Sequence, residues 1–218
     1  MKRESEANGQ AAEREPRGAR RKRETRRRLL EAAFRLVAER GIDAVAVNEI
    51  TEAADVGFGS FYNHFESKES IYSAVVEWLF EDFADWLDRL LADVSDPARV
   101  LSGSVRYTML RAQREPLWGR FLVREGFSVR TVYHGLGRRL LRDIRAGIAA
   151  ERFSSSDSFM SFIAVAGTVL AALSASSIDL GGEFSTKGLP ERTAAVVLRT
   201  LGIEPGEADA IAAEALPE

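Results

Sequence analysis

The chain has 218 residues, of which 45% are hydrophobic and 29% charged, and its formal net charge is −3. This length allows one large or two small domains, and the composition allows a sizeable core in a water-soluble protein. The absence of cysteine excludes disulfides, thiolate zinc sites and cysteine nucleophiles, and two histidines are too few for a His-rich metal site. No apolar signal segment opens the sequence, so we expect a cytoplasmic protein.

The charge is unevenly distributed along the chain. Residues 1–30 hold 11 Lys or Arg against 5 Asp or Glu, so this stretch carries +6 and the remainder carries −9. Such a split indicates a basic segment for a polyanion joined to an acidic body, although a solvated tail that binds nothing has the same composition. Residues 1–21 lack hydrophobic periodicity, and we predict a disordered basic extension there.

Apolar periodicity predicts helices over the rest of the chain. The first four are expected at about 23–40, 47–54, 58–65 and 68–92, with Gly41 ending the first and Ser67 capping the fourth. Asp96-Pro97 opens a fifth helix that ends before Pro116. Further helices are predicted over 116–125, 129–151, 158–180, 190–201 and 205–216. Strand alternation is almost absent, so we predict an all-α fold.

The segment from Ser158 to Ile178 contains no charge and is long enough to span a bilayer. Serines interrupt it, and Asp157 and Asp179 bound it without an aromatic belt or a basic flank. We therefore expect a buried helix or a subunit interface in place of a membrane span.

The three predicted helices of residues 22–67 form a candidate helix-turn-helix, because a Gly-containing turn joins the last two. Phe61 and Phe65 are expected to face inward. The opposite face of the third helix would then contact base edges and phosphates from the major groove. Gly57 and Gly59 remove side chains where a backbone must come close to DNA.

The stretch "VNEITEAADVGFGSFYNHFESKESIY" resembles the TetR-type transcriptional repressors. The resemblance covers about residues 24–75, and the positions that match the family pattern are Ala53, Ala54, Val56, Gly59, Phe61, Tyr62, His64, Phe65, Ser67, Lys68 and Glu69. Three residues depart from it: Asp55 replaces a Gly in the turn, Gly57 replaces a capping Ser, and Ala46 replaces a Thr. Asp tolerates left-handed dihedrals better than most residues, so the turn is expected to form.

The resemblance implies a set of DNA-contacting residues. These are Arg26, Arg27, Asn48, Gly57, Phe58, Gly59, Ser60, Tyr62, Asn63, His64 and Lys68. Tyr62 and Lys68 would contact phosphates, Asn63 could pair with adenine, and Phe58 could press on a thymine methyl. Core packing is the alternative for Tyr62 and Phe58, and a capping or hydrogen-bonding role is the alternative for His64.

The resemblance also implies that residues 68–218 form an effector-binding and dimerisation domain. A dimer would read a two-fold palindrome, and a four-helix bundle is its expected interface. The interface residues predicted from the 158–180 and 190–201 helices are Ala164, Gly167, Ala171, Ala175, Ala194, Ala195, Leu198 and Leu201. The alternative is that the uncharged helix is the central helix of a monomer.

A dense aromatic set could line an apolar effector cavity, with ordinary core packing as the alternative. Its members, with one histidine, are Trp78, Phe83, Trp86, Tyr107, Trp118, Phe121, Phe127 and His134. Arg106, Arg111 and His134 could orient a polar group of the ligand. In the family mechanism, a ligand in this cavity displaces the 68–92 helix, the recognition helices separate and the repressor leaves the DNA.

We therefore expect a ligand-responsive repressor that binds a palindromic operator as a homodimer and is released by a small, largely apolar effector. A ligand-independent architectural DNA-binding protein is the alternative. No catalytic motif, metal site or cofactor site is predicted, since the sequence has no G-x-S-x-G, Walker, zinc or G-x-G-x-x-G pattern in a suitable context.

Overall fold

The computed structural model describes residues 17–176 and 185–217, and within these ranges it contains helices and no strand. The prediction of an all-α fold is confirmed. Eleven helices are described, and their bounds are α1 Arg17–Arg40, α2 Val47–Ala53, α3 Phe58–Phe61, α4 Lys68–Leu90, α5 Pro97–Arg114, α6 Pro116–Glu125, α7 Val129–Tyr133, α8 Gly135–Ala149, α9 Ser158–Ser176, α10 Leu189–Thr200 and α11 Pro205–Ala213.

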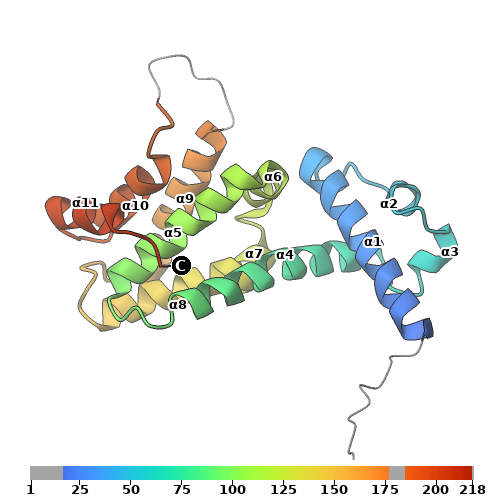
Figure 1. Ribbon diagram of the computed structural model, residues 1–218, viewed down its shortest axis with the longest axis horizontal. Coiled ribbons are helices and arrows are strands. Elements are labelled where there is room, and N and C mark those ends of the chain that lie inside the picture. The colour runs from blue at the N-terminus through green and yellow to red at the C-terminus, as the bar shows by residue number, and fades with distance from the viewer. Residues whose placement is uncertain (1–16, 177–184, 218) are drawn as a thin grey trace, which may run out of the picture.

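Helices α1 to α3 form a small unit at one end of the molecule, and α5 to α11 form a larger bundle at the other (Figure 1). The small unit is held together by apolar side chains that are removed from water, which is the main favourable term in folding. Leu29, Ile50 and Phe61 have no exposed surface, and they come from α1, α2 and α3 respectively.

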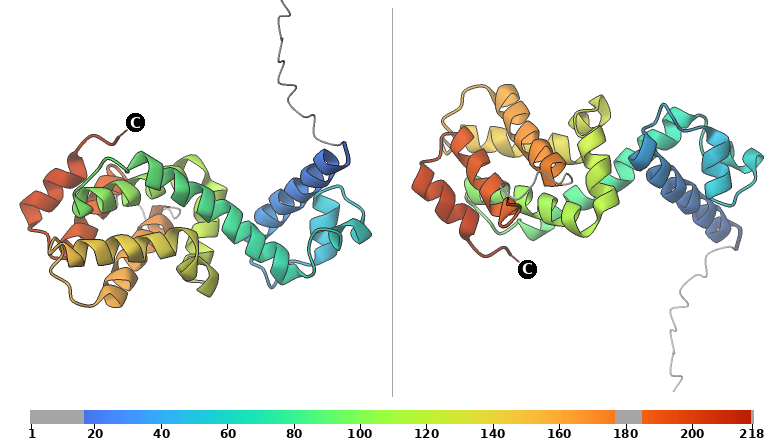
Figure 2. Two further views of the ribbon diagram at one scale, coloured as in Figure 1. Left: turned by 90° about the horizontal axis from the view of Figure 1, so that it is seen from below. Right: turned by 90° about the horizontal axis from the view of Figure 1, so that it is seen from above.

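Helix α4 is the long connection between the two parts, as the views from below and above make clear (Figure 2). It begins where the sequence predicts, because the Ser67 Oγ accepts a hydrogen bond from the backbone N–H of Ser70 at 3.2 Å. The Ser70 hydroxyl in turn accepts from the backbone N–H of Ser67 at 3.1 Å, so this helix start is capped from both sides. Ile71 near this end and Leu87 near the other are both buried.

In the bundle, α9 lies among α5, α6, α8 and α10. It is long and apolar enough to cross a membrane by length and composition alone. One side of it is nonetheless packed inside the protein, where Phe162, Val165 and Leu173 are each at most 3% exposed. This packing agrees with the expected buried helix. The predicted end of the helix at Gly181-Gly182 lies outside the described residues.

The prediction of one helix over 129–151 is wrong, since the chain breaks at Gly135 into α7 and α8. Gly135 has φ +52°, a left-handed conformation that glycine adopts readily. Its backbone N–H donates to Glu81 Oε1 at 2.7 Å, and a Cβ at this position would lie 2.7 Å from the Cβ of Phe80. The close approach to α4 therefore requires glycine here. Its left-handed conformation separates α7 from α8.

Two other boundaries differ from the sequence-based expectation by four residues or more. Helix α1 begins at Arg17, so residues 17–21 are helical and only 1–16 of the predicted extension lie outside the described residues. Helix α3 ends at Phe61, and the chain continues to Phe65 through turns. Gly57 supplies no side-chain cap to α3, which agrees with the weak helix start expected from the missing Ser.

Candidate nucleic-acid interface and internal cavity

The short helix α3 divides its aromatic residues between the inside and the surface. Phe61 and Phe65 are 0% and 5% exposed, whereas Phe58 and Tyr62 are each 54% exposed. Asn63 is exposed as well, and the Phe58 and Tyr62 rings meet edge to face with centroids 5.6 Å apart. Phe61 and Phe65 thus face inward and Phe58 and Tyr62 face outward, as predicted. Packing in the core does not explain why position 58 or 62 is aromatic.

Gly57 and Gly59 lie beside this surface. A Cβ added at Gly59 would meet no atom within 4 Å, and one at Gly57 would meet only the Ser60 hydroxyl at 3.9 Å. Neither glycine has a positive φ. The packing of the chain therefore does not demand glycine at either position, and both leave the backbone open to close approach from outside.

The arginines of α1 differ in how far they are already engaged. Arg27 pairs with Glu24 at 2.7 Å and also with Glu31, so it is not a free cation. The guanidinium of Arg26 lies 4.9 Å from the centre of the Phe65 ring. To contact a phosphate, Arg27 would have to give up or share its ion pairs, and Arg26 would have to leave the Phe65 ring or reach the phosphate from it.

Lys68 and Asn48 sit at the starts of α4 and α2. The Lys68 Nζ donates to the backbone carbonyl of Ile42 at 3.0 Å, which ties α4 to the loop before α2. This bond uses one of three N–H donors, so two remain for another acceptor. Asn48 is exposed, and Glu49 beside it accepts from the backbone N–H of Ala46 at 2.8 Å. Ala46 itself supplies no side-chain cap to α2.

His64 is half-buried at the end of the α3 segment. Burial holds the pKa of His64 below its usual value of 6.5, and the nearby cations Lys22 and Arg26 lower it further. The imidazole is therefore neutral at pH 7, with one ring nitrogen as donor and the other as acceptor.

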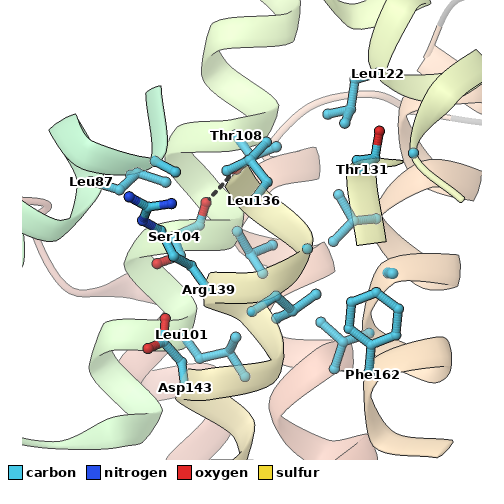
Figure 3. A pocket seen from close by; sticks show the side chains of 18 of the residues that line it. Leu87, Leu101, Ser104, Thr108, Leu122, Thr131, Leu136, Arg139, Asp143 and Phe162 are labelled. Atoms are coloured by element: carbon cyan, nitrogen blue, oxygen red, sulfur yellow. Dashed lines mark hydrogen bonds between the residues drawn. The ribbon is translucent and has the colours of Figure 1, made fainter. Parts of the chain in front are cut away.

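A second feature is an internal cavity of about 100 Å³ in the bundle. Side chains of α4, α5, α6, α7, α8 and α9 line it, it is partly open, and most of its wall is apolar. Figure 3 shows Leu122 and Phe162 on one side of this space and Arg139 and Asp143 on the opposite side. The cavity thus has an apolar body and one charged end.

The charged end contains two carboxylates, Asp88 and Asp143, together with Arg139. Burial raises the pKa of Asp143 above its ordinary 3.8. The pKa of Asp88 is shifted in the opposite direction. Burial raises it, but the hydrogen bonds from Arg142 and Arg139 outweigh this effect and keep the pKa below the ordinary value of 3.8. Arg142 joins the two carboxylates, at 2.7 Å from each.

Arg139 connects the cavity to α4. Its Nη1 lies 2.7 Å from Glu81, its Nε lies 2.8 Å from Asp88, and Nη2 pairs with Asp85. These three carboxylates follow one another at intervals of four and three residues and so share a face of α4. The Arg139 side chain is only 12% exposed, so these pairs are less screened than surface pairs.

None of the eight predicted effector residues lines this cavity, although Phe83, Trp86 and Tyr107 border a separate surface groove together with Arg111. Trp118, Phe121 and Phe83 are core residues on another side of α4, where Trp118 meets Phe83 and Phe80 edge to face. The other members are Trp78, which is partly buried against the core, Trp86 and Tyr107, whose rings meet on the surface, and Phe127 and His134, which are exposed.

The polar residues expected to orient a ligand lie elsewhere as well. Arg106 donates to the backbone carbonyl of Glu214 at 2.7 Å, in the C-terminal segment. The guanidinium of Arg111 lies 4.7 Å from the ring centres of both Phe83 and Trp118. The arginine that does face the cavity is Arg139. Its sequence signal was the spacing of Glu81, Asp85 and Asp88 opposite a helix rich in arginine.

The predicted dimer residues fall into two groups. Ala164, Gly167, Ala171 and Ala175 lie on the partly exposed side of α9, and a Cβ at Gly167 would meet no atom within 4 Å. The α10 residues are corrected: Ala194, Ala195, Leu198 and Leu201 are at most 4% exposed and fill the core of the same chain. The outward side of α10 instead carries Val196, which is 45% exposed.

The described residues contain no group of three or more His, Cys, Asp or Glu that could hold a metal ion. The carboxylates near the cavity are occupied by arginines, as described above.

Two family profiles match the chain. The profile of bacterial regulatory proteins of the tetR family matches residues 29–75, and that of the tetracyclin repressor-like C-terminal domain matches residues 96–214. The first match covers the unit of α1 to α3 with the start of α4. The second covers the bundle that contains the cavity, and by itself it spans more than half of the chain.

Curated relatives match over the N-terminal part. The transcriptional repressor DhaR of Mycobacterium sp. (strain GP1) is 43% identical over 72 residues, which are 33% of this chain and 36% of that protein. The transcriptional repressor KstR2 of Mycolicibacterium smegmatis is 37% identical over 79 residues, or 34% of this chain and 37% of that protein. The match thus spans about a third of the length of these curated relatives.

Solved structures match over the whole fold. The structure of RolR in complex with resorcinol has a TM-score of 0.69 and 34% sequence identity, and the match covers 92% of this chain and 98% of that one. A regulator from Shewanella sp. PV-4 has a TM-score of 0.71 at 19% identity, which supports the fold alone. The chain belongs to the TetR family, whose members are DNA-binding transcriptional regulators that respond to small ligands.

Proposed function

We propose that this protein is a cytoplasmic homodimeric repressor that binds a palindromic operator through α3 and is released by a small hydroxylated ring compound bound in the cavity. The observation that carries this proposal is the physical link between the two sites. Arg139 faces the cavity and pairs with three carboxylates of α4, and α4 is tied to the DNA-binding unit through Lys68.

On the DNA side, α3 would enter the major groove with Phe58, Tyr62 and Asn63 outward. Asn63 has the donor and acceptor needed for a bidentate pair with adenine, and Phe58 is an apolar surface for a thymine methyl. Tyr62 would donate to a phosphate. The open surfaces at Gly57 and Gly59 favour close approach of the protein backbone to the DNA strand.

One α3 reads too few base pairs for specific binding, so a dimer is proposed. The partly exposed side of α9 offers small residues against which a second helix can pack closely. Ala164, Gly167 and Ala171 lie on it at intervals of three and four residues, and Ile163 beside them is 37% exposed. Val196 of α10 would continue this surface.

The effector class follows from the size and polarity of the cavity. Its volume of about 100 Å³ is smaller than an apolar cavity of ~150 Å³ that takes up benzene, so a single ring is the largest ligand that we propose, and its wall would have to widen around it. The charged end of the cavity would bind hydroxyl groups of a ligand, because Asp143 can accept a hydrogen bond from a hydroxyl and Arg139 can donate one to it. RolR, which is 34% identical over nearly the whole chain, has been solved with resorcinol, a ring with two hydroxyls.

Release from DNA requires that the effector bind the DNA-incompetent state more tightly. A hydroxyl that engages Arg139 or Asp88 would compete with the ion pairs between α8 and α4. The position of α4 would then depend on whether the cavity is occupied, and α4 carries the helix-turn-helix at its N-terminal end.

The test has two stages. Selection of duplexes from a random pool should enrich a palindrome, and addition of resorcinol should release the protein from it. Asn63→Ala should alter the enriched sequence, whereas Lys68→Ala should weaken binding to all sequences and lower the salt slope by about one. No enrichment at low salt would refute the repressor. Enrichment without release by resorcinol or related phenols would leave the ligand-independent DNA-binding protein as the better reading and refute the proposed effector.

A further inference from the structure

A series of hydrogen-bonded hydroxyl groups leads from the cavity wall to a buried carboxylate, away from the charged end of the cavity. We propose that the Thr131 hydroxyl accepts a hydrogen bond from a second hydroxyl of the effector. Thr131 is the first member of a hydroxyl relay that continues through Ser128 and Tyr72 and ends at Glu125. The inference rests on the proposed function, because it assigns the part of the effector that faces away from Arg139.

The members of the hydroxyl relay come from α7, α4 and α6. Thr131 lies on α7 and lines the cavity, and its Oγ1 lies 3.0 Å from the Oγ of Ser128, the N-cap residue of that helix. The Ser128 side chain also forms a hydrogen bond with the Tyr72 hydroxyl of α4. Tyr72 in turn donates to Oε2 of Glu125, the last residue of α6. The relay therefore joins the cavity wall to the N-terminal part of α4.

Most of the hydroxyl relay is closed to water. Thr131 is 2% exposed, Glu125 7% and Tyr72 8%. A carboxylate in such a place is costly unless it accepts hydrogen bonds, and the Tyr72 hydroxyl supplies one. Burial and the hydrogen bond to Glu125 raise the pKa of Tyr72, so the phenol keeps its proton and is the donor of this pair.

The direction of the other hydrogen bonds follows from the donors and acceptors that each group has. A serine or threonine hydroxyl has one proton to donate and two lone pairs that accept. Because the Tyr72 proton goes to Glu125, Ser128 must donate to Tyr72. The Ser128 Oγ then accepts from the backbone N–H of Thr131 at 3.3 Å and from its hydroxyl at 3.0 Å. The Thr131 proton is thereby used, and its oxygen keeps the capacity to accept from a group in the cavity.

This arrangement makes the cavity selective for the kind of group at its second end. Figure 3 shows Thr131 beside Leu122, across the space from Arg139 and Asp143. A ligand group next to Thr131 must donate a hydrogen bond, since the Thr131 proton is already given to Ser128. An ether, ketone or halogen at that place would leave a buried oxygen without a partner. The expected effector is therefore a ring with two separate hydroxyl groups.

The carboxylate at the end of the hydroxyl relay strengthens the contact at its beginning. A hydroxyl that donates to a strong acceptor becomes a better acceptor itself, and such series of hydrogen bonds polarise one another in a low-dielectric interior. Each oxygen from Tyr72 to Thr131 donates toward Glu125. Neutralising the carboxylate should therefore weaken the hydrogen bond between the effector and Thr131, although Glu125 is not among the residues that line the cavity.

The experiment measures affinity by isothermal titration calorimetry on the full chain, with resorcinol and 3-fluorophenol as probes. Fluorine is close in size to a hydroxyl but cannot donate a hydrogen bond. The measured quantity is the ratio of the dissociation constant of 3-fluorophenol to that of resorcinol. One net hydrogen bond corresponds to roughly 3- to 10-fold in affinity, so the wild-type ratio should lie in this range.

Two threonine variants test the contact itself. Thr131→Val keeps the shape of the side chain and removes the hydroxyl, so the ratio should fall to about 1. Thr108→Val is the matched control. Thr108 is also buried and lines the cavity, but its hydroxyl donates to the backbone carbonyl of Ser104 in the same helix at 2.7 Å. The control should keep the wild-type ratio.

Two further variants test the hydroxyl relay. Glu125→Gln preserves the size of the side chain and replaces the carboxylate with a neutral amide. Its ratio should lie between those of the wild type and Thr131→Val, while its affinity for 3-fluorophenol stays unchanged. A residue with a purely structural role would lower both affinities together. Tyr72→Phe interrupts the relay at another point and should lower the ratio in the same way, and circular dichroism melting checks that each variant folds.

The possible results separate the inference from the proposed function. A wild-type ratio in Thr131→Val overturns the inference, and so does an equal fall in Thr108→Val. A fall in Thr131→Val without any change in Glu125→Gln and Tyr72→Phe overturns the relay. If the ratios are as expected but resorcinol does not release the DNA, the inference is supported and the proposed effector response is refuted. Failure of the wild type to bind resorcinol would refute both.

Discussion

The Arg28 side chain on α1 donates from Nη2 to both the backbone carbonyl and the carboxylate of Asp55, each at 2.9 Å. Asp55 is the residue at which the turn between α2 and α3 adopts a left-handed conformation, with φ +50°. One guanidinium thus holds in place the turn that orients α3. The family pattern has a glycine here. A glycine could keep the hydrogen bond from Arg28 to the backbone carbonyl but not the one to the carboxylate.

This relationship predicts an order of stability for substitutions at Asp55. Asp55→Gly should leave the stability nearly unchanged, because a relaxed backbone offsets the loss of an ion pair whose carboxylate is 98% exposed. Asp55→Ala should cost about 1 kcal/mol, since alanine tolerates positive φ poorly and makes no contact with Arg28 through its side chain. Asp55→Val should cost more. Chemical denaturation of the three variants checks the order, and an alanine variant as stable as the glycine variant would contradict it.

The helix-turn-helix could be predicted from the sequence because its signals are local. The inward Phe61 and Phe65 and the cap at Ser67 follow from short sequence patterns, whereas Arg28, which contacts Asp55, lies 27 positions away from it. The outward position of Phe58 and Tyr62 followed from the same short pattern. Two boundaries were missed there: residues 17–21 are helical without apolar periodicity, and α3 ends at Phe61 instead of Phe65.

The cavity could not be predicted in the same way, because its wall comes from helices far apart in the sequence. Aromatic density pointed to Trp118 and Phe121, but large rings fill space, and these two are core residues with at most 1% exposure. The observed wall is built from aliphatic side chains and small residues such as Ala84 and Gly126. The break at Gly135 was missed for a related reason, since the need for glycine arises from contact with Phe80 on α4.

The proposed dimer interface predicts an effect of charge at Gly167. Gly167→Arg should yield a monomer, because the side chain would point from the partly exposed side of α9 into a second copy, while a Cβ at this position meets no atom of its own chain within 4 Å. Gly18→Arg is the matched control, since a Cβ there also meets no atom within 4 Å. Sedimentation velocity reports the assembly state. A dimer of unchanged stability in Gly167→Arg would place the interface elsewhere.

The buried Asp143 predicts a pH-dependent stability. Its pKa in the folded state is raised by burial above the ordinary 3.8, so its contribution favours folding below that value and is lost as the pH rises through the folded pKa. Asp143→Asn removes this titration. The stability of the variant relative to wild type should therefore increase from pH 4 upward and level off once Asp143 is ionised in both states, as melting curves across this range can measure. A constant difference between the two proteins at every pH would show that Asp143 titrates normally.

If the effector binds in the cavity, a larger side chain that fills the cavity should abolish ligand binding. Ala166 on α9 lines the cavity and is only partly buried, so Ala166→Leu can place its larger side chain in the empty space without a polar group being disturbed. Resorcinol should raise the melting temperature of the wild-type protein, by an amount that grows with ligand concentration, and should have no such effect on the variant. DNA affinity without ligand should stay within a few-fold of wild type, because α4 and its pairs with Arg139 are untouched. Ala172→Leu on the same helix, outside both the cavity wall and the proposed dimer surface, controls for a general effect of leucine on α9. If Ala166→Leu still responds to resorcinol as the wild type does, the ligand binds somewhere other than this cavity.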